Sequence, residues 1–331
     1  MKMKQIPEDF IVKEIVSKKP IGEGEYTWFT LKKKNWELAK VLDLIAKKCQ
    51  VSRNRFQYAG LKDKNAVTYQ TVSAWKVPEK LLKSLEIKDI ELSDIDKNNR
   101  RIKTDDIKAN FFQITVRDLS QKDLKDIGKK ISKLKGGVLN LFDDQRFGNR
   151  KTNHIIGKFL VKKDFPRAVK ALTANPGNWE SIVLKYISKN PRDFKGSINC
   201  LPKNLKMFLV NSYQSYLWNS FATNYFIGSK SRKNIKIPII GYRTKLENYP
   251  KVKKYIEKML KKEALCTEDF KNIFEDITFA GDERDLFVYP KRVKWKLERD
   301  ELNKNKSKLI ISFELQKGSY GTYIIKSLLS I

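Results

Sequence analysis

The chain has few of the residues that commonly carry acid–base, nucleophilic and metal chemistry. It has one histidine, His154, and three widely separated cysteines, Cys49, Cys200 and Cys266. These residues do not have the spacing of metal ligands, so a zinc site is not expected. An odd number of dispersed cysteines argues against a disulfide framework and favours a reducing, cytoplasmic setting. Acid–base work at neutral pH would then fall to carboxylates, tyrosine, lysine or the substrate itself.

Long apolar runs and nucleotide-binding glycine loops are also missing. No stretch approaches the roughly 18 apolar residues that a membrane-spanning helix needs. The first ten residues are polar, so we expect no secretory signal peptide. Gly22-Glu23-Gly24 is too short for a dinucleotide fingerprint, and there is no Walker-type loop. Nucleotide-driven chemistry and a membrane location are therefore not expected.

Positive charge is what the chain has in excess. Its 331 residues include 69 Lys+Arg and 38 Asp+Glu, which gives a formal net charge of +31. Such an excess attracts polyanions and makes their binding salt-dependent. Aromatic side chains are interleaved with the basic clusters, which favours an RNA or DNA partner over a merely solvated surface. The clusters are Lys47-Lys48 with Arg53 and Arg55, Arg100-Arg101, and residues 230–236, 251–262 and 291–296.

Hydrophobic periodicity predicts a β-rich start and end around a helical middle. A domain interrupted by an inserted helical domain fits this order. Strands are expected at 10–16, 26–31, 67–77, 111–116, 292–297 and 309–315. Helices are expected after Asn35 as N-cap, from Ser120 to about Leu134, at 205–226 and 252–262, and from Ser319.

Two segments are candidates for chemistry. In the first, Asp63 lies between Lys62 and Lys64 on a turn joining two apolar runs. A solvated turn is the ordinary interpretation, but apolar flanks place this acid better for chemistry. In the second, Asn140 and Phe142 precede Gln145-Arg146-Phe147-Gly148. Phe142 is ordinarily a core residue, yet a flipped base would also use a stacking ring, an amide and Arg146 to bind a phosphate or brace the loop.

Together these segments resemble the TruD family of pseudouridine synthases. The blocks Gly-Leu-Lys-Asp-Lys and Asn-x-Phe-x-x-Gln-Arg-Phe-Gly are the most specific, and the matches follow the family's order across nearly the whole chain. The matching segments are residues 7–14, 22–25, 59–68, 140–148, Ser215-Tyr216-Leu217-Trp218-Asn219 and Gly318-Ser319-Tyr320-Gly321-Thr322.

The resemblance implies an α+β fold. It implies a pseudouridine synthase catalytic domain at 1–157 and 289–331, with a mixed, mostly antiparallel sheet flanked by helices, and an inserted, mainly helical TruD-specific domain at 158–288. Members isomerise a uridine of tRNA, typically at position 13, without a cofactor. We expect an archaeal-type, cytoplasmic, monomeric enzyme with no obligate protein partner. A basic cleft between the domains would bind the tRNA.

The resemblance also assigns roles to residues. Asp63 is the expected catalytic nucleophile, acting on the sugar or the base, although a carboxylate could also act as a base toward C2′. Phe142 would lie against the target base and Asn140 would contact the substrate. The other expected substrate-binding residues are Phe10, Tyr320 and Lys4 from the resemblance, and Lys62, Lys64 and Arg146 from charge and residue type.

Two other functions fit parts of the sequence. A non-catalytic RNA-binding protein, such as a chaperone of tRNA folding, would use the same basic surface but would not require an acid beside an aromatic pocket. A metal-dependent nuclease would need spaced acids, whereas Asp105-Asp106 and Asp143-Asp144 are adjacent.

Overall fold

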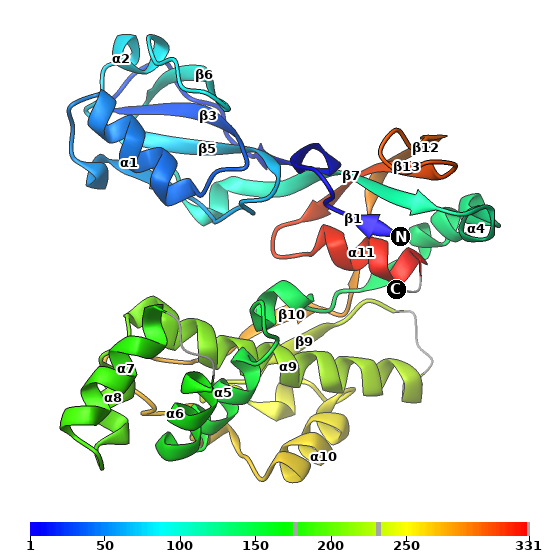
Figure 1. Ribbon diagram of the computed structural model, residues 1–331. Coiled ribbons are helices and arrows are strands. Elements are labelled where there is room, and N and C mark those ends of the chain that lie inside the picture. The colour runs from blue at the N-terminus through cyan, green and yellow to red at the C-terminus, as the bar shows by residue number, and fades with distance from the viewer. Residues whose placement is uncertain (175–177, 230–232, 330–331) are drawn as a thin grey trace. The chain divides into compact units, whose positions relative to one another are not determined.

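The computed structural model describes residues 1–174, 178–229 and 233–329, which divide into two compact units (Figure 1). Unit 1 comprises Met1–Lys135, Tyr289–Gly321 and the residues from Ile325, and unit 2 comprises Gly136–Val288 with Thr322–Ile324. Unit 2 begins at Gly136, and the segment after this glycine pairs within unit 2. The domain boundaries expected after residues 157 and 288 stay a prediction.

Unit 1 is built on a nine-stranded sheet, with strand order β12-β13-β7-β2-β5-β3-β6. β1 pairs with β7 and β4 with β5, and β2–β5 is the parallel pair in an otherwise antiparallel sheet. This confirms the expected α+β fold with a mixed, mostly antiparallel sheet. The strands are β1 (Lys2–Met3), β2 (Phe10–Val16), β3 (Tyr26–Lys34), β4 (Phe56–Tyr58), β5 (Val67–Trp75), β6 (Ile90–Asn98), β7 (Ile107–Leu119), β12 (Lys291–Arg299) and β13 (Ser307–Gln316).

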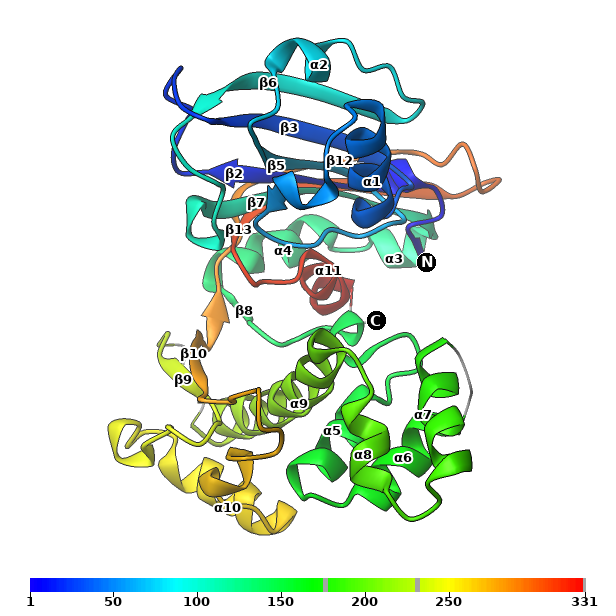
Figure 2. The ribbon, with the colours of Figure 1, turned by 90° about the vertical axis from the view of Figure 1, so that its left-hand side faces the viewer.

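Helix α1 (Leu38–Lys48) covers one face of this sheet next to β3 and β5, as Figure 2 shows. Leu38, Leu42 and Ile45 recur at helical spacing and are buried against alternate strand residues such as Phe29 and Leu31. The cap expected at Asn35 is wrong. Asn35 has φ +58° and the N-cap is Glu37, so the chain makes an additional turn before the helix.

The helix expected from Ser120 to Leu134 is interrupted. Ser120 does cap its start, since its hydroxyl accepts a hydrogen bond from the Asp123 backbone N–H. Asp126, however, adopts φ +59°, which breaks the helical hydrogen-bond ladder. The remaining helical segments of unit 1 are α2 (Glu79–Lys83), α3 (Gln121–Leu124), α4 (Ile127–Ser132) and most of α11 (Gly321–Leu329), with 3-10 turns at Pro7–Asp9, Arg53–Arg55, Thr104–Asp106 and Lys133–Gly136.

Unit 2 is mostly helical, as the sequence indicates. The long α9 (Lys203–Ser229) packs against α5 (Asn153–Val161), and Gly157 makes their close approach possible because a Cβ there would lie 2.2 Å from the Leu209 carbonyl oxygen. The other elements are α6 (Phe165–Thr173), α7 (Asn178–Lys189), α8 (Phe194–Asn199), α10 (Lys253–Glu263), the pairs β8 (Val138–Leu139) with β11 (Phe287–Val288) and β9 (Lys236–Ile239) with β10 (Asp282–Asp285), and 3-10 turns at Asp144–Phe147, Leu246–Asn248 and Thr267–Phe270.

The helices in the described ranges include none that is both long enough and apolar enough to cross a membrane. Even α9 carries polar side chains around its circumference, and Ser212 and Gln214 are among its buried residues.

Candidate active site

Asp63 lies on the irregular loop between β4 and β5 and is bound by two lysines from elsewhere in unit 1. The Lys4 ammonium lies 2.5 Å from the Asp63 carboxylate, and the two side chains are only 25% and 16% exposed. The Lys33 ammonium donates a hydrogen bond to the Asp63 backbone oxygen over 2.8 Å. Asp63 is thus held at its carboxylate by Lys4 and at its backbone oxygen by Lys33.

Lys33 is a fully buried cation at the end of β3. Burial lowers its pKa from the ordinary value to about 8, because desolvation outweighs the attraction of Asp63, and the charge of Lys62 lowers the pKa further. Lys33 therefore places a positive charge under the Asp63 loop at neutral pH and loses it under mildly alkaline conditions.

Lys4 is held in a conformation that lysine adopts rarely. Its φ is +58°, and the next two backbone N–H groups, of Gln5 and Ile6, both donate to the buried Asp9 carboxylate. Asp9 in turn accepts a hydrogen bond of 2.8 Å from the Arg117 guanidinium. This arrangement directs the Lys4 ammonium to a point 3.8 Å from the centre of the Phe10 ring, as well as to Asp63.

The sequence neighbours of Asp63 have other positions than expected. Lys62 forms an ion pair of 2.6 Å with Glu14, whose side chain is 1% exposed and also accepts from the Thr71 backbone. Lys64 is exposed. The ion pair of Asp63 is therefore with the distant Lys4, because residues next to each other on an irregular loop direct their side chains differently.

Tyr320 is half-buried on the segment between β13 and α11. Among the described residues, four buried side-chain oxygens of unit 1 have no hydrogen-bond partner: Thr68 Oγ1, Gln70 Oε1, Asn110 Oδ1 and Ser319 Oγ. The amide of Gln70 also donates to the Gly60 carbonyl, at the start of the Asp63 loop. Such unsatisfied atoms are costly unless a ligand or water binds them.

Asn140 and Phe142 lie together in unit 2, and Arg284 of β10 links them. The Arg284 guanidinium lies 4.2 Å from the centre of the Phe142 ring and donates two hydrogen bonds of 2.7 Å to the Asn140 backbone and side-chain oxygens. Both residues are nearly buried, at 2% exposure for Asn140 and 8% for Phe142. The loop is therefore rigidly held.

One face of α9 supports the same loop. Asn219 exchanges two hydrogen bonds of 2.9 Å with the Phe142 backbone, and the Trp218 ring meets Phe142 edge-on. Ser215 accepts a hydrogen bond from Arg146, whose guanidinium lies 5.6 Å from the Phe142 ring. In this structure Arg146 braces the loop. Thr322, from the last of the matched motifs, donates to Asp143.

The structure thus forms two clusters, one in each unit. Lys4, Phe10 and Asp63 come together in unit 1, and Asn140, Phe142 and Arg146 come together in unit 2. Within the described ranges, no group of three or more His, Cys, Asp or Glu side chains could hold a metal ion.

Sequence reasoning missed Lys33, Glu14 and Arg284. A signal existed for Lys33, because it follows Phe29 and Leu31 in the alternation of β3 and so occupies a position on the buried face. Arg284 gave no such signal, since only tertiary structure brings it to a loop 144 residues away.

Comparison with known proteins agrees with these motifs. The family model described as tRNA pseudouridine synthase D (TruD) matches residues 1–181, 177–227 and 224–328. A Methanocaldococcus jannaschii protein named "Probable tRNA pseudouridine synthase D 2" is 32% identical, over 98% of this chain and 91% of its own length. A Methanococcus vannielii protein, named "Probable tRNA pseudouridine synthase D", is 30% identical over 98% of this chain and 94% of its own.

The fold is also similar to that of a crystal structure from Methanosarcina mazei whose protein is assigned the same TruD name. The TM-score is 0.77 with 24% identity, over 100% of this chain and 93% of the other. At this identity the likeness supports the fold. The family match, in contrast, spans nearly the whole sequence, and it includes the loops that carry Asp63 and Phe142. The chain therefore belongs to the tRNA pseudouridine synthase D (TruD) family, a family of RNA-modifying isomerases.

Proposed function

We propose that this protein converts a uridine of tRNA, at position 13, into pseudouridine, with Asp63 as the catalytic nucleophile. The reaction breaks the bond between ribose C1′ and uracil N1 and forms one between C1′ and C5, while N1 gains a proton and C5 loses one. Atoms and electrons balance without an external reactant, so the proposal includes no cofactor. The observation that carries it is the ion pair of Lys4 and Asp63 beside the Phe10 ring.

Asp63 would act at the sugar–uracil linkage. Its carboxylate is largely shielded from solvent, which strengthens its electrostatic interactions and limits competition by water. Lys4 and Lys33 would keep its position and balance its charge during bond cleavage. Lys62 would hold the loop through Glu14, and the exposed Lys64 would bind a phosphate of the RNA.

The target uridine must leave the base stack before its glycosidic bond can be reached. We propose that Phe10, Phe142 and Tyr320 enclose the flipped base and that Asn140 hydrogen-bonds to it. Arg284 and Arg146 would keep Phe142 and Asn140 in place, as the contacts of their loop favour. Retention of the detached uracil in such a pocket lets it rotate and rejoin through C5.

The partner in this proposal is tRNA, bound by a protein that acts as a cytoplasmic monomer. The net charge of +31 favours a polyanionic substrate. The basic cleft expected between the catalytic and inserted domains stays a prediction.

Replacement of Asp63 tests the proposal. Transcribed tRNA incubated with the wild-type protein should acquire a new pseudouridine, which carbodiimide mapping locates. Asp63→Asn should abolish this product while tRNA affinity and melting temperature stay close to wild type. Asp94→Asn is a matched control, because Asp94 is an exposed acid of the same sheet and should be replaceable without loss of activity.

Full activity of Asp63→Asn would refute the catalytic assignment. Product at another uridine would refute the choice of position 13 only. Tight tRNA binding with no product from any variant, wild type included, would favour the RNA-chaperone alternative.

A further inference from the structure

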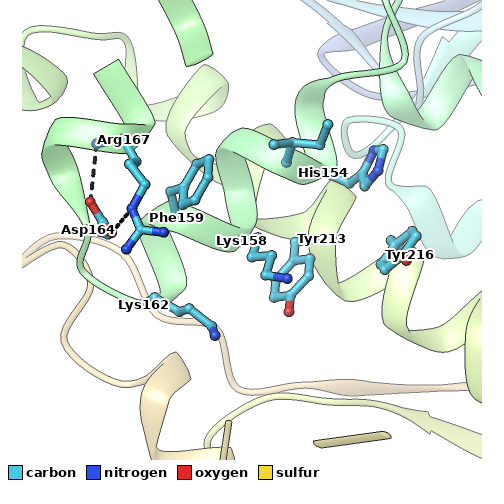
Figure 3. A pocket seen from close by; sticks show the side chains of 9 residues that line it. His154, Lys158, Phe159, Lys162, Asp164, Arg167, Tyr213 and Tyr216 are labelled. Atoms are coloured by element: carbon cyan, nitrogen blue, oxygen red, sulfur yellow. Dashed lines mark hydrogen bonds and ion pairs between the residues drawn. The ribbon is translucent and has the colours of Figure 1, made fainter. Parts of the chain in front are cut away.

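We propose that a pocket of unit 2, between α5 and α9, binds a second nucleotide of the RNA, separate from the uridine that is isomerised. This inference rests on the proposed function, because it assumes an RNA substrate. The pocket has a volume of about 490 Å³ and is lined by α5, the start of α6 and α9 (Figure 3). Small-ligand pockets range from roughly 300 to 1,000 Å³, so a nucleotide is of suitable size.

Tyr216 provides an aromatic surface in this pocket. Its ring is stacked on His154, with ring centres 4.7 Å apart and an interplanar angle of 17°, and it lies nearly parallel to the more distant Tyr213 ring at 6.2 Å. His154 is in turn held edge-on by Phe147 at 5.4 Å. Tyr216 is nevertheless 39% exposed. A ring fixed by its neighbours loses little entropy when a base stacks on its exposed part.

The charges around the pocket complement one phosphodiester. Lys158 is paired with Glu263 at 2.8 Å and Arg167 with Asp164 at 2.5 Å. Lys162 also lines the pocket, and it has no ion pair within the parts of the chain that the structure describes. Among the charged residues that line the pocket, Lys162 is thus the cation left for a phosphate. Burial lowers the pKa of His154, so the imidazole is neutral at physiological pH and does not alter this balance.

A nucleotide can bind such a pocket through its base, which stacks on the ring, and through its phosphate, which the lysine attracts. Base stacking is tolerant of sequence, and a lysine binds the phosphate as a point charge. The aromatic ring and the positive charge lie in the same pocket. His154, on which Tyr216 stacks, is spaced four residues from Lys158 and eight from Lys162, so the three residues share one face along and just beyond α5.

The helix α9 connects this pocket with the Phe142 loop. Tyr213 and Tyr216 line the pocket, whereas Ser215 and Asn219, on an adjacent face, hold Arg146 and Phe142. A nucleotide bound at Tyr216 would therefore anchor the RNA at a fixed position relative to Phe142. The pocket adds affinity and register, and it contributes no group to the chemistry.

Equilibrium binding of full-length tRNA to the full-length protein tests this inference. Tyr216→Leu should weaken binding on the order of ten-fold, the expected loss of one stacked base, with kcat at saturating tRNA unchanged. Tyr216→Phe keeps the ring and should bind like wild type. Lys162→Gln should reduce the slope of log affinity against log salt by about one.

Two exposed residues on α7 serve as controls, Trp179→Leu for the ring and Lys189→Gln for the charge. Wild-type affinity and salt slope in Tyr216→Leu and Lys162→Gln, or equal losses in the α7 controls, would overturn the inference while leaving the proposed function intact. Failure of the wild-type protein to bind tRNA at all would instead contradict the proposed function and this inference together.

Discussion

At the scale of single residues, two lysines that hold Asp63 come from positions far from it in sequence. Lys4 and Lys33 reach it from the N-terminal segment and from β3, while Lys62 is engaged by Glu14. A buried lysine is costly as a charge, and Lys33 donates its hydrogen bond to the Asp63 backbone oxygen. This makes Lys33 the most informative residue for a test of the electrostatics.

Lys33→Met should change how stability depends on pH. In the wild type the folded pKa of Lys33 is about 8, below that of an unfolded lysine, so the cost of burying its charge is fully present below pH 8 and is relieved as the pH rises toward 10.5. The free energy of unfolding of the wild type should thus rise relative to that of Lys33→Met, by up to about 3 kcal/mol.

Urea denaturation of both proteins at intervals between pH 7 and pH 10.5 measures this difference. A constant difference across the range would show that Lys33 does not titrate there. Lys33→Met should also reduce turnover, since the Asp63 backbone loses its donor.

Arg284→Lys should impair unit 2 even though it conserves the charge. Lysine cannot reproduce the guanidinium contact with the Phe142 ring together with two hydrogen bonds to Asn140. We expect a loss of about 1–3 kcal/mol in unfolding free energy and a lower kcat/KM for tRNA. Arg243→Lys, an exposed arginine of the same unit that stacks beside Tyr242, is the matched control and should change neither quantity.

At the scale of elements, the hydrophobic pattern predicts strands and helices well where buried residues recur at the regular spacing of a strand or a helix. β2 matches its expected range fully, and β3, β5, β13 and α9 differ from theirs by a few residues at their ends. The two-residue strands β1, β8 and β11 could not be predicted, because each is defined by its partner and is too short to show alternation. The break at Asp126 could not be predicted, because apolar residues continue at helical spacing after it, as Ile127 and Ile131 do.

Gly157→Ala tests the packing of α5 on α9. Alanine normally stabilises a helix by about 1 kcal/mol relative to glycine, but here its Cβ would lie 2.2 Å from a backbone oxygen of α9, which cannot move away like the tip of a side chain. We expect a net loss of about 1–3 kcal/mol in the free energy of unfolding.

Gly136→Ala is the matched control for Gly157→Ala. A Cβ at Gly136 meets nothing within 4 Å, so its effect on thermal and urea denaturation should be small. A Gly157→Ala protein as stable as wild type would mean that α5 shifts readily along α9.

At the scale of the whole molecule, the sequence indicates the candidate site residues better than it indicates the tertiary contacts that hold them. The motifs select Asp63, Phe142 and Asn140 as candidate site residues, and these assignments stay predictions. Of the residues that contact these candidates, Lys4 is expected from the resemblance. Arg284 could not be found from the sequence, because only the fold brings it to Asn140. The basic cluster at 230–236 lies partly outside the described residues.

The net charge of +31 predicts strongly salt-dependent tRNA binding. If about six phosphates are neutralised, affinity should fall on the order of 1,000-fold between about 50 and 200 mM salt. Filter binding at several salt concentrations gives the slope, and a slope near zero would exclude a mainly electrostatic footprint. A melting temperature measured at each concentration separates weaker binding from loss of structure.

The strand β12 has a consequence for the protein in the absence of RNA. It ends the sheet of unit 1, and most of its residues are exposed, lysines 291, 294 and 296 among them. An open strand edge is a template on which a second chain can add its own strand, and aggregates grow in this way. Mutual repulsion between these lysines of neighbouring molecules opposes such strand addition, so positive charge on this edge favours a dispersed protein.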